Sequence, residues 1–142
     1  MKPLVGFLVL IAALVHAPLG WSGSYEPTDA ERARWTMSDM RSIAIACEAY
    51  RIDNFSFPAA AWLEELERLV APTYIRSLPR HDAWGTPLRY ERMEDGKAMR
   101  IISAGSDGRF EPDTWSSPEA LVDYSQDAVI EGSRILTRIW QY

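Results

Sequence analysis

The chain has 142 residues, of which 47% are hydrophobic and 25% charged, which is typical of one ordinary globular domain rather than of a disordered chain. The formal net charge is -5, and lysine and arginine form no basic block. This composition argues against binding to nucleic acid or to an anionic membrane surface, because such binding would need a basic face.

The N-terminal segment, residues 1–23, has the pattern of an export signal. A positively charged start is followed by an apolar run from Leu4 to Val15 and then by small residues. The run is short for a membrane span, which needs about 20 residues. We expect a signal peptide cut near Ser22 or Gly23, with an uncleaved anchor as the alternative. In either case residues 24–142 form a globular domain that is periplasmic or secreted, or held at the inner membrane.

The stretch from Thr28 to Asp53 predicts one long amphipathic helix. Apolar residues recur every three or four positions with charges between them. These are Ala33, Met37, Met40, Ala44, Cys47 and Tyr50. Thr28 and Glu31 have the spacing of a capping box, which fixes the start of the helix. Such a long helix requires other elements to lie along it. Cys47, the only cysteine, is expected to be a small buried side chain without a disulfide.

A turn over Asn54 to Pro58 separates this helix from a second one, predicted from Pro58 to Val70. Proline suits the first position of a helix, and Pro72 would stop it. The expected buried stripe of the second helix is Trp62, Leu63, Leu66, Leu69 and Val70. The two helices should pack as a hairpin.

The second half of the chain changes towards the period of two that is typical of strands. Two strands are predicted, Pro87 to Arg92 and Ala98 to Ser103, joined by a turn that contains Asp-Gly. Gly105 to Gln126 has no periodicity and is expected to be a long loop, and Ala128 to Trp140 returns to β character. The sequence therefore predicts an α+β domain: a long N-terminal helix and a short second helix packed on a small antiparallel β-sheet.

A tight turn is expected at Trp84-Gly85, where glycine supplies a positive φ and the tryptophan anchors the turn on the core. His81 lies beside this turn and is interpreted as a surface residue, because no partner for catalysis is evident.

Three strings taken together resemble the G-type major pseudopilins of type II secretion systems. They are EAYRIDNFSFP (Glu48 to Pro58), YIRSLPRHDAWGTPLRY (Tyr74 to Tyr90) and IISAGSDGRFE (Ile101 to Glu111). Their order and spacing match the family over about Trp35 to Gly108. The resemblance implies a pseudopilin-like fold, a non-enzymatic role in an envelope or secretion assembly, and other proteins of that assembly as partners.

The resemblance also implies a calcium ion, held after the second strand by aspartate carboxylates and main-chain carbonyls. This sequence offers the carboxylates of Asp107, Asp123 and Asp127, and the carbonyls of Ser103 and Gly105. Calcium prefers about six to eight oxygen ligands, and a glycine-rich turn lets carbonyls point inward. The alternative is that Asp107 only favours the turn and Asp123 only caps it.

The leader departs from the family pattern. In pseudopilins a processing site is followed by an apolar helix with glutamate at its fifth place, and that helix runs unbroken into the soluble domain. Here Gly6-Phe7 is followed by an apolar run without that glutamate, and Pro18 and Pro27 interrupt a continuous helix. This argues against assembly into a pilus-like fibre by the family's usual route.

Two further classes of function remain open at this stage. One is a secreted stand-alone protein-binding or inhibitory module, whose contact surface would be the Arg109 to Val122 loop with Phe110 and Trp115 exposed. The other is an enzyme that uses the acid pair Asp123 and Asp127. Catalysis is disfavoured, because the sequence has no Ser/His/Asp order, no histidine pair for a metal and no phosphate-binding loop.

Overall fold

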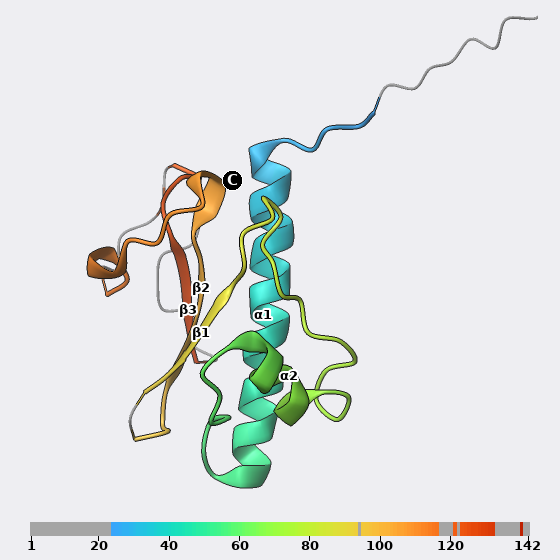
Figure 1. Cartoon of the computed structure of the whole chain (residues 1–142), viewed down its shortest axis with the longest axis vertical. Coiled ribbons are helices and arrows are strands. Elements are labelled where there is room, and N and C mark those ends of the chain that lie inside the picture. The colour runs from blue at the N-terminus through green and yellow to red at the C-terminus, as the bar shows by residue number, and fades with distance from the viewer. Residues whose placement is uncertain (1–23, 94, 117–120, 122, 133–139, 141–142) are drawn as a thin grey trace, which may run out of the picture.

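A computed structural model describes residues 24–93, 95–116, 121, 123–132 and 140. Its helices and strands are α1 (Asp29–Asn54), α2 (Leu63–Val70), β1 (Arg89–Arg92), β2 (Met99–Ser103) and β3 (Ala128–Glu131), with two short 3-10 helices, η1 (Gly105–Asp107) and η2 (Pro112–Thr114). The strands form one antiparallel sheet in the order β1-β2-β3. The sheet lies along one side of α1, and α2 lies beside the lower half of α1 (Figure 1). The predicted α+β fold is confirmed, whereas the predicted leader lies outside the described residues.

The start of α1 is fixed by the predicted capping box. The backbone N–H of Glu31 donates to the Thr28 hydroxyl over 3.3 Å, and the Glu31 carboxylate accepts the Thr28 N–H over 2.9 Å. The Tyr25 hydroxyl also donates to Glu31. These hydrogen bonds lower the pKa of Glu31 to about 2, and the bond from Tyr25 has the largest effect, followed by that from the Thr28 N–H. The carboxylate therefore stays charged beside the positive end of the helix dipole.

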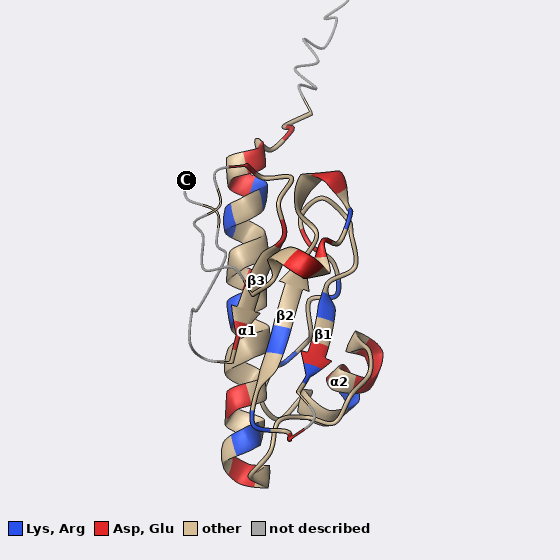
Figure 2. Cartoon of the chain, turned by 90° about the vertical axis from the view of Figure 1, so that its left-hand side faces the viewer, with Lys and Arg blue, Asp and Glu red and all other residues tan. Residues whose placement is uncertain are grey.

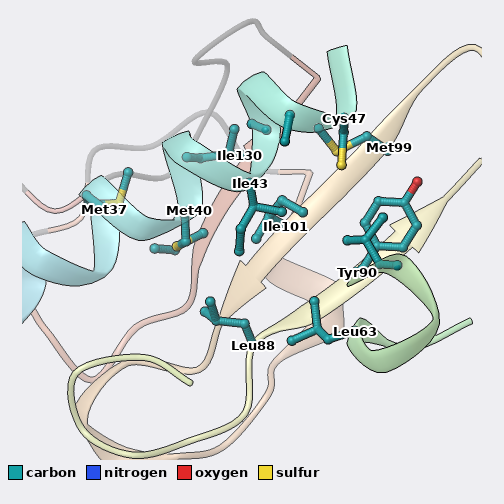
Figure 3. Close-up of a cluster of buried hydrophobic side chains, with 14 of the residues drawn as sticks. Met37, Met40, Ile43, Cys47, Leu63, Leu88, Tyr90, Met99, Ile101 and Ile130 are labelled. Atoms are coloured by element: carbon teal, nitrogen blue, oxygen red, sulfur yellow. The ribbon is translucent and has the colours of Figure 1, made fainter. Parts of the chain in front are cut away.

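One face of α1 is buried against the sheet. Its buried residues are Ala33, Thr36, Met37, Met40, Ile43, Ala44, Ala46 and Cys47. In Figure 3, side chains of this face point towards residues of the sheet and towards Leu88, which directly precedes β1. The sheet residues are Tyr90, Met99, Ile101 and Ile130. Fully burying such a large apolar side chain contributes roughly 1.5–3 kcal/mol relative to exposure.

The structure confirms that Cys47 is a buried side chain without a disulfide. Burial is the main cause that raises the pKa of its thiol to about 12, and the charge of Glu48 adds to it. The thiol therefore stays protonated and is no nucleophile at neutral pH.

The second helix begins at Leu63, so the predicted start at Pro58 was wrong. The Pro58 carbonyl accepts the Tyr90 hydroxyl over 2.7 Å, which holds the segment before α2 against β1. The short helix buries only the stripe Leu63, Leu66 and Val70. Trp62 and Leu69, predicted as buried, are 61% and 36% exposed.

The first two strands begin later than predicted, β1 at Arg89 and β2 at Met99, whereas β3 begins at Ala128 as predicted. Pro87 pairs with His81 in an isolated bridge, and β1 begins only at Arg89. The predicted Asp-Gly hairpin is confirmed, because Arg92 pairs with Met99 across the turn. β3 ends at Glu131, and most of the predicted continuation towards Trp140 lies outside the described residues.

Lysine and arginine residues alternate with aspartate and glutamate residues along α1 and the sheet (Figure 2). None of the helices in the described ranges is long and apolar enough to cross a membrane.

The burial pattern of α2 gives a direct test with two leucines on one helix. Leu66→Ala should lower the free energy of unfolding by about 2–5 kcal/mol, because Leu66 is fully buried. Leu69→Ala, the matched control, should cost less than about 1 kcal/mol. Urea denaturation of both variants and the parent measures the difference. Equal losses would contradict this placement of α2.

Candidate functional site

A buried carboxylate ties the turn before β1 to the end of β2. Oδ1 of Asp82 accepts the N–H groups of Trp84 over 3.1 Å and Thr86 over 2.9 Å. Its Oδ2 accepts the hydroxyl of Ser103 over 2.8 Å. Both Asp82 and Ser103 are buried. Ser103, predicted as a carbonyl ligand, is thus held by its side chain at the point where the long loop begins.

The two parts of the predicted calcium loop meet at Gly105. The Gly105 N–H donates to the Ser103 hydroxyl over 3.2 Å, and φ of Gly105 is +70°. A Cβ at this position would lie 2.4 Å from the Tyr124 carbonyl oxygen and 2.8 Å from that of Gln126. The Ser106 N–H donates to the same Tyr124 carbonyl over 2.7 Å. The structure therefore brings the segment after β2 against the segment before β3, and only glycine fits at the contact.

Asp127 is fully buried at the start of β3. Its Oδ2 accepts the indole N–H of Trp115, and the N–H of Glu111 over 2.7 Å. Its Oδ1 is buried without a hydrogen-bond partner in the described chain. A buried carboxylate oxygen without a partner is costly, so this atom is a favourable position for a cation.

Asp107 and Asp123 are exposed and support their own turns. Oδ1 of Asp107 accepts the Arg109 N–H over 2.9 Å, and Oδ1 of Asp123 accepts the Ser125 N–H over 2.9 Å. These bonds agree with the alternative that both residues stabilise turns. Among the residues that the structure describes, no three acidic, histidine or cysteine side chains are grouped to hold a metal. A calcium site here would therefore depend on main-chain carbonyls for much of its coordination.

The aromatic pair of the loop is not an exposed contact surface, so that prediction was wrong. Trp115 is 4% exposed and packs with Ile102 and Val129. Phe110 is half-buried, and its ring meets that of Trp115 edge to face at 6.3 Å between centroids. The hydrogen bond from Trp115 to Asp127 explains the burial, because it gives the indole N–H a partner inside the fold.

The turn at Trp84-Gly85 has the predicted form. Gly85 has φ +92°, and the Trp84 ring packs edge to face on Trp140 at 5.3 Å between centroids. The Trp84 indole N–H also donates to Asp29 of α1 over 2.8 Å. The turn is therefore anchored on the first turn of α1 as well as on the core.

Asp82 and the bond between Trp115 and Asp127 were missed by sequence reasoning. The Asp82 side chain binds the amides two and four residues later, and an aspartate before a tryptophan-glycine turn was the available signal. Its bond to Ser103 joins residues far apart in the chain and leaves no local pattern.

A long capped helix packed on a three-stranded antiparallel sheet, with a loop folded back by buried carboxylates, defines an α+β domain of the pseudopilin type. The chain belongs to the type II secretion system protein G family, whose model matches residues 24–116.

Two relatives illustrate the similarity. The chain is 32% identical to a type II secretion system core protein G of Pseudomonas aeruginosa over 50% of this chain and 57% of the relative. It is 26% identical to a protein of the same description from Xanthomonas campestris pv. campestris over 72% of this chain and 76% of the relative. No solved structure matches the chain.

The contact at Gly105 can be separated from its backbone conformation by a matched pair of variants. Gly85→Ala introduces a Cβ at positive φ into open space, whereas Gly105→Ala also drives it into the Tyr124 carbonyl. We expect Gly85→Ala to lower the free energy of unfolding by about 1–2 kcal/mol, and Gly105→Ala by clearly more. Urea denaturation measures both losses. If both variants lost the same amount, the close approach of the two loop segments would be refuted.

Proposed function

We propose that this chain is a non-enzymatic structural component of a type II secretion system or a related envelope assembly. The observation that carries the proposal is the family match over residues 24–116, which spans α1, α2, β1, β2 and most of the loop. Residues 24–142 would lie outside the cytoplasm, periplasmic or secreted, with residues 1–23 acting as signal peptide or inner-membrane anchor. Its partners would be other proteins of the assembly, and nucleic acid would not be among them.

The alternative, a secreted protein-binding or inhibitory module, depended on an exposed aromatic loop. Burial of Trp115 removes the main side chain of that surface. The structural role is therefore the better supported of the two.

An enzymatic role also finds little support in the geometry. Asp123 is exposed and bound to its own turn, whereas Asp127 is buried and bound to Trp115 and Glu111. Within the described ranges, the carboxylates of Asp123 and Asp127 share no hydrogen bond, which a pair that works as general acid and base would be expected to form.

We further propose that the loop after β2 binds calcium. The carboxylates of Asp107, Asp123 and Asp127 and the carbonyls of Ser103 and Gly105 would hold the ion. The unpartnered Oδ1 of Asp127 and the contact between the two loop segments at Gly105 support this proposal. A bound cation would give the negatively charged Oδ1 the partner that it lacks and would join the two segments that already touch.

The structural role predicts recovery of the chain with secretion-system proteins. A tagged full-length chain, cross-linked in the envelope of its own organism and purified, should carry such proteins when examined by mass spectrometry. Residues 1–23 fused to an unrelated exported protein serve as the control, because they carry the leader without the domain. Recovery of a single soluble target instead would contradict the role in an assembly.

The calcium site predicts a stabilisation that depends on Asp127. At a calcium concentration of 100 times the dissociation constant, the native state gains about 2.7 kcal/mol, so the melting temperature should rise by several degrees over that in chelator. Asp127→Asn should lose this rise. Asp113→Asn, an exposed acidic residue of η2, should keep it.

Comparing calcium with chelator within each variant cancels any change in its basal stability. The same rise in Asp127→Asn as in the parent, or no rise in the parent, would refute the site.

A further inference from the structure

The sheet has an open edge at β1, beside the start of α2. The strand order β1-β2-β3 leaves one side of β1 without a neighbouring strand, and in Figure 2 β1 is the strand nearest α2. A short antiparallel pairing covers only the beginning of this edge. In that pairing His81 lies opposite Pro87, and the Leu88 N–H donates to the Arg80 carbonyl over 2.9 Å. Beyond Leu88 no strand of the described chain covers the edge.

The backbone of Tyr90 faces this open edge. In antiparallel strands, residues that bond to the neighbouring strand alternate with residues whose backbone groups point away from it. The Leu88 N–H points away from β2 to reach Arg80, so the N–H and C=O of Tyr90, two residues later, point the same way. The Met93 N–H, at an odd spacing from Tyr90, instead crosses the hairpin and donates to Ala98 over 3.0 Å, as this alternation requires. Among the described residues, neither backbone group of Tyr90 has a hydrogen-bond partner.

A pocket with an apolar wall opens beside these backbone groups. It has a volume of about 400 Å³ and lies between the start of α2 and β1. Leu63 and Leu88 line it, and both lie close to Tyr90 in Figure 3. The indole of Trp62, which is 61% exposed, also lines it. Unpaired backbone groups next to an apolar pocket are the two features by which a sheet edge binds an extended peptide: the backbone gives affinity, and the pocket selects a side chain.

The two arginines of the lining are already engaged. Arg80 forms an ion pair with Glu64 over 3.7 Å. The guanidinium of Arg89 stacks on the Phe110 ring, 3.7 Å from its centroid. Because successive side chains of a strand point to opposite faces, Arg89 lies on the other face of the sheet from the apolar wall.

Glu91 is a carboxylate of the lining that forms no ion pair among the described residues. It shares the face of Arg89, away from the apolar wall. Its neighbour across the strands is Arg100, which is paired with Glu131 over 3.4 Å. Glu91 therefore favours a lysine or arginine on this face of an incoming strand.

From these observations we infer that an extended segment of another protein adds to β1 as a fourth, antiparallel strand. The residue opposite Tyr90 exchanges backbone hydrogen bonds with it and places an apolar side chain between Trp62 and Leu63. The next residue points to the other face, where a basic side chain meets Glu91. The partner is thus a segment in which apolar and basic residues alternate. Antiparallel pairing is expected because it is slightly more stable than parallel pairing, and the sheet uses it throughout.

This inference deepens the proposed structural role, since it gives the chemistry of a partner, and it rests on that role for the source of the segment. The contact itself is tested with the purified full-length chain and a synthetic peptide of three Lys-Leu repeats, blocked at both ends. In the free chain the Tyr90 N–H should exchange with solvent faster than the Glu91 N–H, which points to β2. Added peptide should shift the Tyr90 amide resonance saturably and slow its exchange.

Backbone methylation of the peptide separates strand addition from other modes of binding. Methyl groups on the leucine amides remove the N–H that reaches the Tyr90 carbonyl and should weaken binding by about tenfold or more. The matched control carries the methyl groups on the lysine amides, which point away from β1, and should bind like the unmodified peptide. Equal weakening by both patterns, or none by the first, would overturn the inference.

Two variants of the chain test the side-chain contacts. Trp62→Ala should weaken peptide binding by about tenfold, because the indole forms part of the pocket. Glu91→Gln should weaken it by roughly two- to fivefold, as expected for an ion pair near the surface. Leu69→Ser, which changes an exposed apolar residue of α2 outside the pocket, is the control and should bind like the parent.

Melting curves of the three variants show whether the fold is retained. An unchanged Tyr90 resonance in the parent, or undiminished binding by Trp62→Ala, would contradict strand addition at this edge. These results come from purified protein and a synthetic peptide, so they are distinguishable from a failure to recover secretion proteins from the envelope.

Discussion

The packing of one face of α1 against the sheet is the interaction on which the rest of the structure depends. The side chains from Ala33 to Cys47 on this face, together with β2 and β3, form most of the buried core. The three strands are short, and a sheet of this size needs an apolar surface to cover it. Because α1 supplies that surface over most of its length, the loops are positioned relative to the helix rather than to a second sheet.

Two buried carboxylates then position the loops on this frame. Asp82 joins the turn before β1 to Ser103 at the end of β2, and Asp127 joins the start of β3 to Trp115 and Glu111. Hydrogen bonds to a charged group contribute about 1.5–3 kcal/mol each, more than those between neutral groups. The same arrangement leaves one oxygen of Asp127 without a partner, and for this reason the candidate ion site and the fold of the loop depend on one side chain.

Features that depend on near neighbours could be predicted from the sequence, and features that depend on distant ones could not. The capping box of Thr28 and Glu31, the buried stripe of α1 and the Asp-Gly hairpin are local patterns, and all three were right. The predicted start of α2 at Pro58 was wrong, because the distant Tyr90 hydroxyl binds the Pro58 carbonyl and holds this residue outside the helix. Burial of Trp115 was likewise missed, because its partner Asp127 follows twelve residues later. The five predicted calcium ligands came from the family resemblance, and the unpartnered oxygen of Asp127 became visible only in the structure.

Whether α1 and the sheet form one cooperative core is tested most directly by native-state hydrogen exchange of the full-length chain. Amides of α1 from Ala33 to Cys47 and amides of β2 should share the highest protection and should open together in the global unfolding reaction. The end of α1 beyond Tyr50 should exchange faster, since its side chains are largely exposed. Strong protection of α1 with rapid exchange of β2, or the reverse, would contradict a single cooperative core, because helix and sheet would then open as separate units.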